Sequence, residues 1–310
     1  MSGTGFFLPM DDGAEIYVHK WDKVPQPKAV LQLAHGMAEH ILRYDSFAQA
    51  CNRQGIIVLG SDHRGHGRTA EKSGQQGYFA PEKGFDRVVQ DLFTLNRRIQ
   101  TEFPQIPIFL MGHSMGSFLT RRYLQIYGNS IAGAILMGSG GDPGLAAVLG
   151  KLIARLEMKR DPQKPSPLLD WLAFGGFNRG IKNPASKFSW LSRDSAQVGL
   201  YEQDPLCGFV CSSGFFYDLF TGLAQIHDDS LFRDIPPKLP LLVLSGDQDP
   251  VGKNGKAIKE FVAQYRKHGI TEIETILYPG ARHELLNETN KSEVITDICR
   301  WLKEQLAKEA

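Results

Sequence analysis

Short apolar runs recur along the chain with helical segments between them, and this alternation restricts the possible folds more than any other feature. The runs that look like strands are 29–34, 55–62, 106–112, 131–138, 240–246 and 273–280. Most of them are continuous rather than alternating, which is typical of strands buried on both faces of a parallel sheet. Residues 3–22 read as a hairpin that turns at Asp12 and Gly13. The sequence therefore predicts an α/β protein with a mostly parallel central sheet and helices on both faces.

The alternation of strands and helices stops between about residues 140 and 235. That stretch has no strand-like run, contains two helix-like patches and includes the segment DPQKPSP. The strands resume after DIPPKLP. We therefore predict a core formed by residues 1–139 and 235–310, with a mostly helical cap inserted at residues 140–234.

Composition and charge exclude several classes of protein. A hydrophobic content of 42% with 22% charged residues is typical of a soluble globular protein. The formal net charge of +1 gives no reason to expect a nucleic acid as partner, and no protein partner is indicated. The first residues lack the positive flank and apolar stretch of a signal peptide, and no apolar run approaches the ~18 residues of a membrane span. We expect a cytoplasmic protein, for which peripheral contact with a membrane stays open.

The four cysteines, Cys51, Cys207, Cys211 and Cys299, are scattered and form no CxxC motif. We expect free thiols in a reducing compartment. Cys207 and Cys211 have no histidine or cysteine partner at the spacing of a zinc site, so no metal site is predicted.

The segment GHSMG at residues 112–116 is the strongest candidate for a catalytic motif. It follows a strand-like run and precedes a helical stretch, which is the setting of a nucleophile elbow. Gly112 and Gly116 would remove side chains where the sharp turn leaves no room for them. We predict Ser114 as a nucleophile, although a serine in an ordinary helix-start turn remains the simpler alternative.

A serine hydroxyl needs a base to take its proton, and an acid to orient that base. His283 lies in a loop after the strand-like run 273–280, and Asp247 and Asp249 follow the run 240–246. The order Ser114, Asp249, His283 is that of the α/β-hydrolases, with each residue in a loop after a strand. We favour Asp249 as the orienting acid, because Asp247 directly follows Gly246 and is better placed to shape the turn.

The oxyanion of a tetrahedral intermediate needs fixed N–H donors. The backbone amides of Met115, directly after the nucleophile, and of Met37, in the loop HGMAEH, are predicted to supply them. His35 in that loop is expected to brace the turn. We also interpret SDHRGHGRT at residues 61–69 as a structural loop, because its glycines open no clear helix of a dinucleotide-binding site.

Four motifs together, HGMAEH, DHRGHGRT, GHSMG and GDQD with GARHE, resemble the monoacylglycerol lipase and lysophospholipase branch of the serine α/β-hydrolases, with serine aminopeptidase S33-type enzymes. The resemblance spans nearly the whole chain and implies a helical cap over an acyl pocket. It also implies that Glu39 and Arg43 hold the glycerol end of the substrate. This chain has Leu286 where monoacylglycerol lipases carry a second histidine, which weakens the transfer of monoglyceride specificity.

The cap segment LAAVLGKLIARLEMKR is an amphipathic helix with basic residues beside its apolar face. Its apolar residues are Leu145, Val148, Leu149, Leu152, Ile153 and Leu156. We expect this face to pack on the pocket or on the rest of the cap; contact with a membrane interface is the alternative.

The predicted function is hydrolysis of the carboxylic esters of acyl lipids, monoacylglycerol or lysophospholipid, through an acyl-enzyme. No metal or organic cofactor is expected, and the predicted partner is a small-molecule acyl ester. The alternatives are a broad carboxylesterase for short acyl groups, a peptidase of the same superfamily, or a non-catalytic binding protein on this fold.

Overall fold

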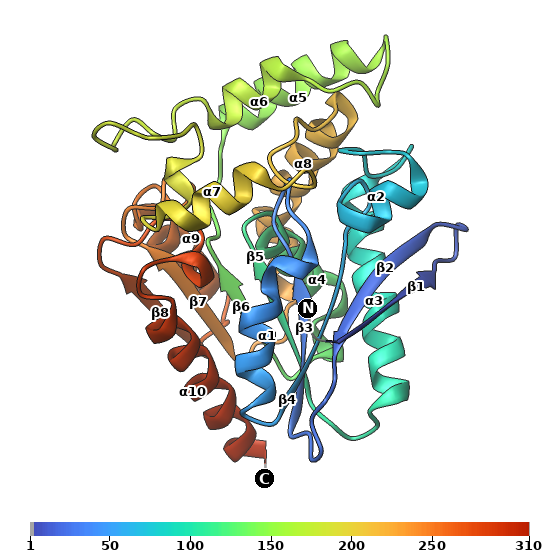
Figure 1. Cartoon of the computed structure of the whole chain (residues 1–310), viewed down its shortest axis with the longest axis vertical. Helices are drawn as coiled ribbons and strands as arrows, with labels where there is room; N and C mark the ends of the chain where they lie inside the picture. The colour runs from blue at the N-terminus through green and yellow to red at the C-terminus, as the bar shows by residue number, and fades with distance from the viewer. Residues whose placement is uncertain (1–2, 310) are drawn as a thin grey trace.

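An eight-stranded sheet forms the centre of the computed structural model, which describes residues 3–309 (Figure 1). The strand order is β1-β2-β4-β3-β5-β6-β7-β8. The strands are β1 (Thr4–Pro9), β2 (Glu15–Trp21), β3 (Ala29–Ala34), β4 (Ile56–Ser61), β5 (Ile108–His113), β6 (Gly133–Met137), β7 (Leu241–Gly246) and β8 (Ile273–Tyr278). The hairpin β1–β2 is antiparallel, as is the pair β2–β4, and the remaining pairs are parallel. The predicted α/β sheet is therefore confirmed.

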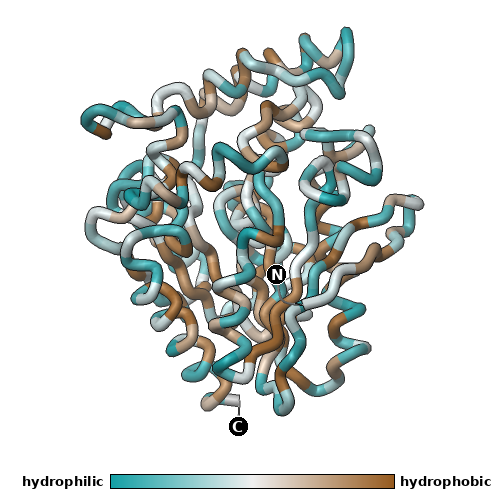
Figure 2. The backbone as a smooth tube through the Cα atoms, in the orientation of Figure 1, coloured by the Kyte–Doolittle hydropathy of each residue, from teal (hydrophilic) through white to brown (hydrophobic). Residues whose placement is uncertain are grey.

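Helices cover both faces of the sheet because side chains of each central strand alternate between two hydrophobic cores. In β5, Leu110 belongs to the core under α3, α4 and α9, whereas Met111 belongs to the core under α1 and α10. In Figure 2 hydrophobic stretches run along the central strands. The core helices are α1 (Asp45–Asn52), α2 (Gly67–Ser73), α3 (Gly84–Glu102), α4 (Met115–Tyr127), α9 (Lys256–Lys267) and α10 (Lys291–Glu309).

The segment 61–69 differs from its prediction as a loop, since α2 begins inside it at Gly67. The Asp62 carboxylate accepts hydrogen bonds from the amides of Ile41 and Arg68, and so replaces a conventional cap from the residue before the helix. A helix of seven residues is too short for hydrophobic periodicity to show it in the sequence.

Between β6 and β7 the chain leaves the sheet and forms the helices at the top of Figure 1. They are α5 (Leu145–Met158), α6 (Pro167–Phe174), α7 (Ser195–Gln203) and α8 (Ser213–Ile226), with 3-10 turns at η3 (Ser189–Leu191) and η4 (Asp229–Asp234). The sequence indicated two helical patches here, whereas the structure has four α-helices among the residues described. Helices α6 and α7 have only 8 and 9 residues, which is short for hydrophobic periodicity to show them in the sequence.

Helix α5 packs on α8 through its small residues rather than through its leucines. Ala147, Gly150 and Ala154 are its buried residues, and a Cβ atom at Gly150 would lie 2.6 Å from the Phe220 ring. Leu145 is 81% exposed and Leu152 is 56% exposed. The expectation that this apolar face packs on the pocket or on the rest of the cap is therefore wrong for most of its residues, although Leu149 and Ile153 line a cavity beneath the cap. The reason is that α8 presents bulky aromatic rings, and only a helix face made of small residues can approach them closely.

Within residues 3–309, none of the helices has the length and apolar character that a bilayer crossing needs.

Candidate active site

Ser114 lies at the sharp turn between β5 and α4, with backbone angles φ 53° and ψ −120°. A non-glycine residue rarely adopts such a conformation, and strain of this kind is typical of a nucleophile elbow. Both neighbouring glycines are required by close backbone contacts. A Cβ at Gly112 would lie 2.1 Å from the Gly116 carbonyl oxygen, and one at Gly116 would lie 2.0 Å from that of Ala34. The turn is thus held against β3 at a separation that no larger residue would allow.

His283 and Asp249 come together from the loops that follow β8 and β7. The Nδ1 atom of His283 lies 3.0 Å from Oδ2 of Asp249, and both side chains are almost fully buried. The other carboxylate oxygen of Asp249 accepts a hydrogen bond of 2.9 Å from the Val251 amide. This arrangement fixes the imidazole so that Nδ1 carries the proton and Nε2 is free to act as a base.

Asp247 has a different role. Its Oδ1 accepts a hydrogen bond of 2.7 Å from the Gly280 amide and so ties the loop after β7 to the turn after β8. That turn leads directly to His283. Asp247 therefore shapes the loops that present the pair Asp249–His283.

The loop after β3 lies against the nucleophile. A Cβ at Gly36 would lie 3.3 Å from Cβ of Ser114, and the next residue, Met37, lines the same pocket as Ser114 and Met115. Ala38 has a positive φ of 52°, which turns the chain sharply after Met37. The structure thus brings both residues predicted to supply oxyanion donors to the wall of the pocket that holds Ser114.

Three buried histidines brace this loop from behind. His35 donates from Nδ1 to the Gly36 carbonyl and accepts at Nε2 from the His63 amide, at 2.7 and 3.0 Å. The Nε2 atom of His63 in turn lies 3.1 Å from the His35 carbonyl. Burial lowers the pKa of His63 to about 3 and that of His66 to about 4. Burial also lowers the pKa of His35, so all three rings are neutral near pH 7. His35 and His63 hold the loop by hydrogen bonds, and the His66 ring packs against that of His35.

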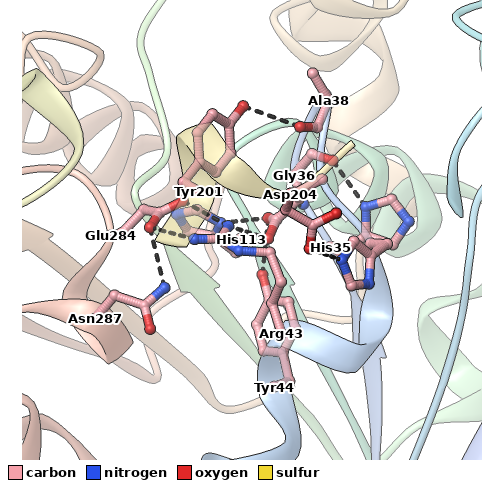
Figure 3. A network of polar contacts seen from close by, with 12 residues as sticks. His35, Gly36, Ala38, Arg43, Tyr44, His113, Tyr201, Asp204, Glu284 and Asn287 are labelled. Atoms are coloured by element: carbon pink, nitrogen blue, oxygen red, sulfur yellow. Dashed lines mark hydrogen bonds and ion pairs between the residues drawn. The ribbon is translucent and has the colours of Figure 1, made fainter. Parts of the chain in front are cut away.

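Glu39 and Arg43 belong to a buried charge network, of which Figure 3 labels Arg43, His113 and Glu284. One oxygen of Glu39 accepts hydrogen bonds from the Gly36 amide, the Tyr44 hydroxyl and His113 Nδ1. The other accepts a bond of 2.7 Å from Arg43. Glu39 is only 2% exposed, and its acceptor sites are therefore taken by protein groups.

Arg43 makes a bidentate pair with Glu284, with both N···O distances at 2.7 Å. Burial opposes ionisation of Glu39, but the charge of Arg43 and the bond to His113 outweigh it and hold the pKa of Glu39 well below its usual value. The pKa of Glu284 is also lowered, because burial is again outweighed by Arg43. The network is thus a set of ionised groups that neutralise one another next to the oxyanion loop.

We expect Glu39→Gln to destabilise the protein by about 3–5 kcal/mol at pH 7, the usual cost of removing one member of a buried ion pair. Urea unfolding measures this change. Because the pKa of Glu39 is depressed on folding, its contribution is complete above pH 4.5 and is lost as the pH falls through the lower folded value. The difference between wild type and variant should therefore shrink in acid.

The matched control is Glu274→Gln, which removes a half-exposed partner of Arg300 and should cost less than about 1 kcal/mol. Equal losses for the two variants would contradict the structural role of Glu39.

A cavity of 790 Å³ opens onto Ser114, Met37 and His283 beneath the cap. Its walls are largely apolar side chains, among them Phe118, Ile153, Leu169, Phe174, Leu219 and Leu223. A second cavity of 370 Å³ lies behind Glu39, His113 and Glu284, which line both cavities. Leu286 lines the second cavity and packs against the core under α1 and α10.

The sequence reasoning did not single out several residues that surround His283. The rings of His113 and Trp190 lie 4.9 and 5.0 Å from the His283 ring. The Glu284 amide donates to the carbonyl of Leu191 in η3, so the cap holds the loop of His283. In the sequence, His113 and Glu284 could have been noticed because each is adjacent to a predicted catalytic residue, Ser114 or His283. Trp190 and Leu191 had no such signal, because they reach the site only through the cap.

The fold and the elbow define an α/β-hydrolase. The chain belongs to the serine aminopeptidase S33 family, whose family model matches residues 25–290.

Individual relatives are similar along nearly their whole length. The chain is 27% identical over 299 residues to a monoacylglycerol lipase of Mycolicibacterium smegmatis, with 95% of each chain covered. It is also 27% identical to a monoglyceride lipase of Rattus norvegicus, over 96% of this chain and 89% of that one. A thermostable carboxyl esterase from Bacillus coagulans, solved in complex with glycerol, superposes with a TM-score of 0.91 at 27% identity and 99% coverage of both chains.

Proposed function

We propose that this protein hydrolyses carboxylic esters of acyl lipids, with monoacylglycerol as the substrate class that fits best. The observation that carries the proposal is the large, mainly apolar cavity that opens onto Ser114 and His283. A cavity of 790 Å³ is at the upper end of the usual range for ligand sites and suits an extended acyl chain. The lipase relatives support the same substrate class.

In the proposed mechanism Ser114 Oγ attacks the ester carbonyl while His283 Nε2 takes its proton. Asp249 keeps the imidazole oriented and stabilises the imidazolium. The amides of Met37 and Met115 bind the oxyanion. His283 then passes the proton to the leaving alcohol, and water activated by the same nitrogen releases the fatty acid.

Glu39 and Arg43 have a structural part in this proposal. Their hydrogen-bonding groups are engaged with Gly36, Tyr44, His113 and Glu284, so they act by holding the oxyanion loop. To bind the substrate alcohol directly, these two residues would have to break hydrogen bonds within this network. Leu286 adds no polar group to that end of the site.

An aminopeptidase would need a carboxylate pair in the cap to bind the free amine. Among the described residues that line the main cavity, Asp170 is the one carboxylate from residues 140–234. Glu39 and Glu284 also line it, but both are already paired with Arg43, and Glu39 is also paired with His113. This charge arrangement favours an ester substrate over an α-amino peptide.

The deciding experiment compares kcat/KM for p-nitrophenyl esters of increasing chain length with the rates on monoacylglycerol and lysophosphatidylcholine. We expect a rise with chain length and cleavage of monoacylglycerol. A short-chain carboxylesterase is the second candidate, favoured by the similarity to the Bacillus coagulans enzyme. A preference for acetyl or butyryl esters, with neither lipid cleaved, would establish that alternative and reject the lipase proposal.

We also propose that the cap docks on lipid surfaces through an exposed apolar patch. This cap patch consists of Leu145, Val148, Leu149, Leu152 and Leu156 of α5 with Leu168, Trp171 and Leu172 of α6. Leu149, Trp171 and Leu172 also line the catalytic cavity, so the patch is continuous with the route to Ser114. Arg155, Lys159 and Lys164 are exposed nearby and would face anionic headgroups. Figure 2 shows hydrophobic residues in these two outer helices.

We expect the double variant Leu145→Ser/Leu152→Ser to lose at least about tenfold in affinity for phosphatidylcholine vesicles containing phosphatidylserine, because each leucine contributes about 1.5–3 kcal/mol when buried. Vesicle sedimentation measures the affinity, and hydrolysis of a soluble short-chain ester should be unchanged.

Ile126→Ser is the matched control, since Ile126 is 43% exposed on α4 and lies outside the cap patch. Equal vesicle binding by wild type and the double variant would reject membrane docking through the cap patch.

A further inference from the structure

Three side chains with metal-binding atoms meet where the cap touches the loop after β3. His40 Nε2 lies 2.8 Å from Asp204 Oδ2, and one ring nitrogen of His40, one carboxylate oxygen of Asp204 and the Cys207 sulfur all lie within 4.8 Å of one another. His40 follows Glu39 in the core, whereas Asp204 and Cys207 belong to the loop between α7 and α8. Asp204 is labelled in Figure 3. None of these groups has a part in the proposed hydrolysis.

The three atoms form a donor set suited to zinc. An imidazole nitrogen, a carboxylate oxygen and a thiolate are the ligands that Zn²⁺ takes in proteins, and adjacent ligands in a tetrahedral site lie about 3.6 Å apart. The His40 and Asp204 atoms, at 2.8 Å, are closer than that and the Cys207 sulfur lies within 4.8 Å, so shifts of roughly 1 Å in the loop of Cys207 would complete the site. The Asp204 side chain is 30% exposed, which leaves a path from solvent.

The local charges also suit a divalent cation. Asp204 supplies one negative charge, and Cys207 supplies a second when a metal displaces its proton, because burial raises the pKa of the free thiol. Arg43 is near Cys207, but Glu39 and Glu284 already neutralise it through bonds of 2.7 Å. Zn²⁺ would therefore form a neutral site without competing against an unpaired positive charge.

We propose that His40, Asp204 and Cys207 bind a Zn²⁺ ion that clamps the cap to the oxyanion loop. On binding, the Cys207 thiol releases its proton to solvent and its sulfur bonds to the metal, while water fills the fourth position. The sequence could not show this site, because His40 is far from Cys207 along the chain and the three residues do not have the short, regular spacing of a zinc-binding motif.

The loop between α7 and α8 already contacts Ala38, and the proposed effect of the metal follows from this contact. The Ala38 carbonyl accepts hydrogen bonds from the Tyr201 hydroxyl and the Gly208 amide, both at 2.9 Å. Gly208 directly follows Cys207, and Ala38 directly follows Met37. A metal at Cys207 would thus restrain movement of the cap relative to the oxyanion loop and slow turnover. This effect on rate rests on the proposed function, whereas binding of the metal does not.

The test uses Co²⁺ as a spectroscopic substitute for Zn²⁺, added to the full-length protein after treatment with a chelator. We expect one equivalent to bind with a thiolate-to-cobalt charge-transfer absorption that Zn²⁺ displaces. Cys207→Ser should abolish that absorption and weaken Co²⁺ binding, measured by calorimetry, more than about tenfold, since even outer-shell changes cost that much. Asp204→Asn should weaken binding while retaining the absorption.

Two controls locate the ion. Cys211→Ser removes a buried thiol four positions along the same loop, and His268→Gln removes the exposed pair with Asp229; both should bind Co²⁺ like wild type. No charge-transfer absorption in wild type, or binding that depends on Cys211 or His268 instead, would overturn the proposed site.

A rate measurement tests the clamp itself. Zn²⁺ should inhibit hydrolysis by wild type with the affinity found by calorimetry, and excess chelator should restore it. Cys207→Ser should resist the same Zn²⁺ concentration. Metal bound through Cys207 with no change in rate would overturn the clamp, and an inactive wild-type protein would instead count against the proposed function.

Discussion

Replacing Ser114 by alanine should lower kcat for ester hydrolysis by about 10⁴- to 10⁶-fold, because the covalent route through the acyl-enzyme is lost. The residual rate would come from the oxyanion donors and from substrate binding alone. Stopped assays with monoacylglycerol and a p-nitrophenyl ester measure the loss. A fluorophosphonate probe should label wild type at Ser114 and should not label the variant.

A second substitution separates loss of the nucleophile from loss of the fold. Ser114→Gly should be as inactive as Ser114→Ala but more stable by about 1 kcal/mol, since glycine accepts the φ of 53° without strain. Ser130→Ala, in the 3-10 turn after α4, should keep its activity within about twofold, because Ser130 does not line the cavity that holds Ser114. Hydrolysis by Ser114→Ala at the wild-type rate would reject the serine hydrolase mechanism.

Replacing Asp249 by asparagine should lower kcat by about 10⁴-fold with little change in KM. The carboxylate at 3.0 Å from His283 Nδ1 favours the tautomer with a proton on that nitrogen. An asparagine amide can donate there instead, which moves the proton to Nε2 and leaves no base beside Ser114. The same substitution also removes the negative charge that stabilises the imidazolium.

Asp247→Asn is the matched control, because Asp247 is two positions away in the same loop. Its side-chain oxygen can still accept the hydrogen bond from Gly280, so kcat should fall less than about tenfold. A larger loss for Asp247→Asn than for Asp249→Asn would show that the two aspartates have the opposite roles.

Local sequence was sufficient for the sheet and for the candidate catalytic residues. Apolar runs that are mostly continuous predicted β3 to β7, which are buried along their whole length, and a more mixed run predicted the edge strand β8. The order of Ser114, Asp249 and His283 after three of those runs was also readable, because the carboxyl ends of parallel strands meet at one edge of the sheet. These features depend only on residues close together in the chain.

Tertiary structure alone decided which groups are engaged and which are free. The family resemblance implies that Arg43 holds the glycerol end of the substrate, and only the folded structure shows that Glu284 lies 2.7 Å from it and pairs with its charge. The leucines of α5 read as a core face, but the rings of α8 admit only Ala147, Gly150 and Ala154. His40, Asp204 and Cys207 have no pattern in sequence at all. Such contacts join segments distant in the chain, and neither spacing nor periodicity records a neighbour that only packing brings into reach.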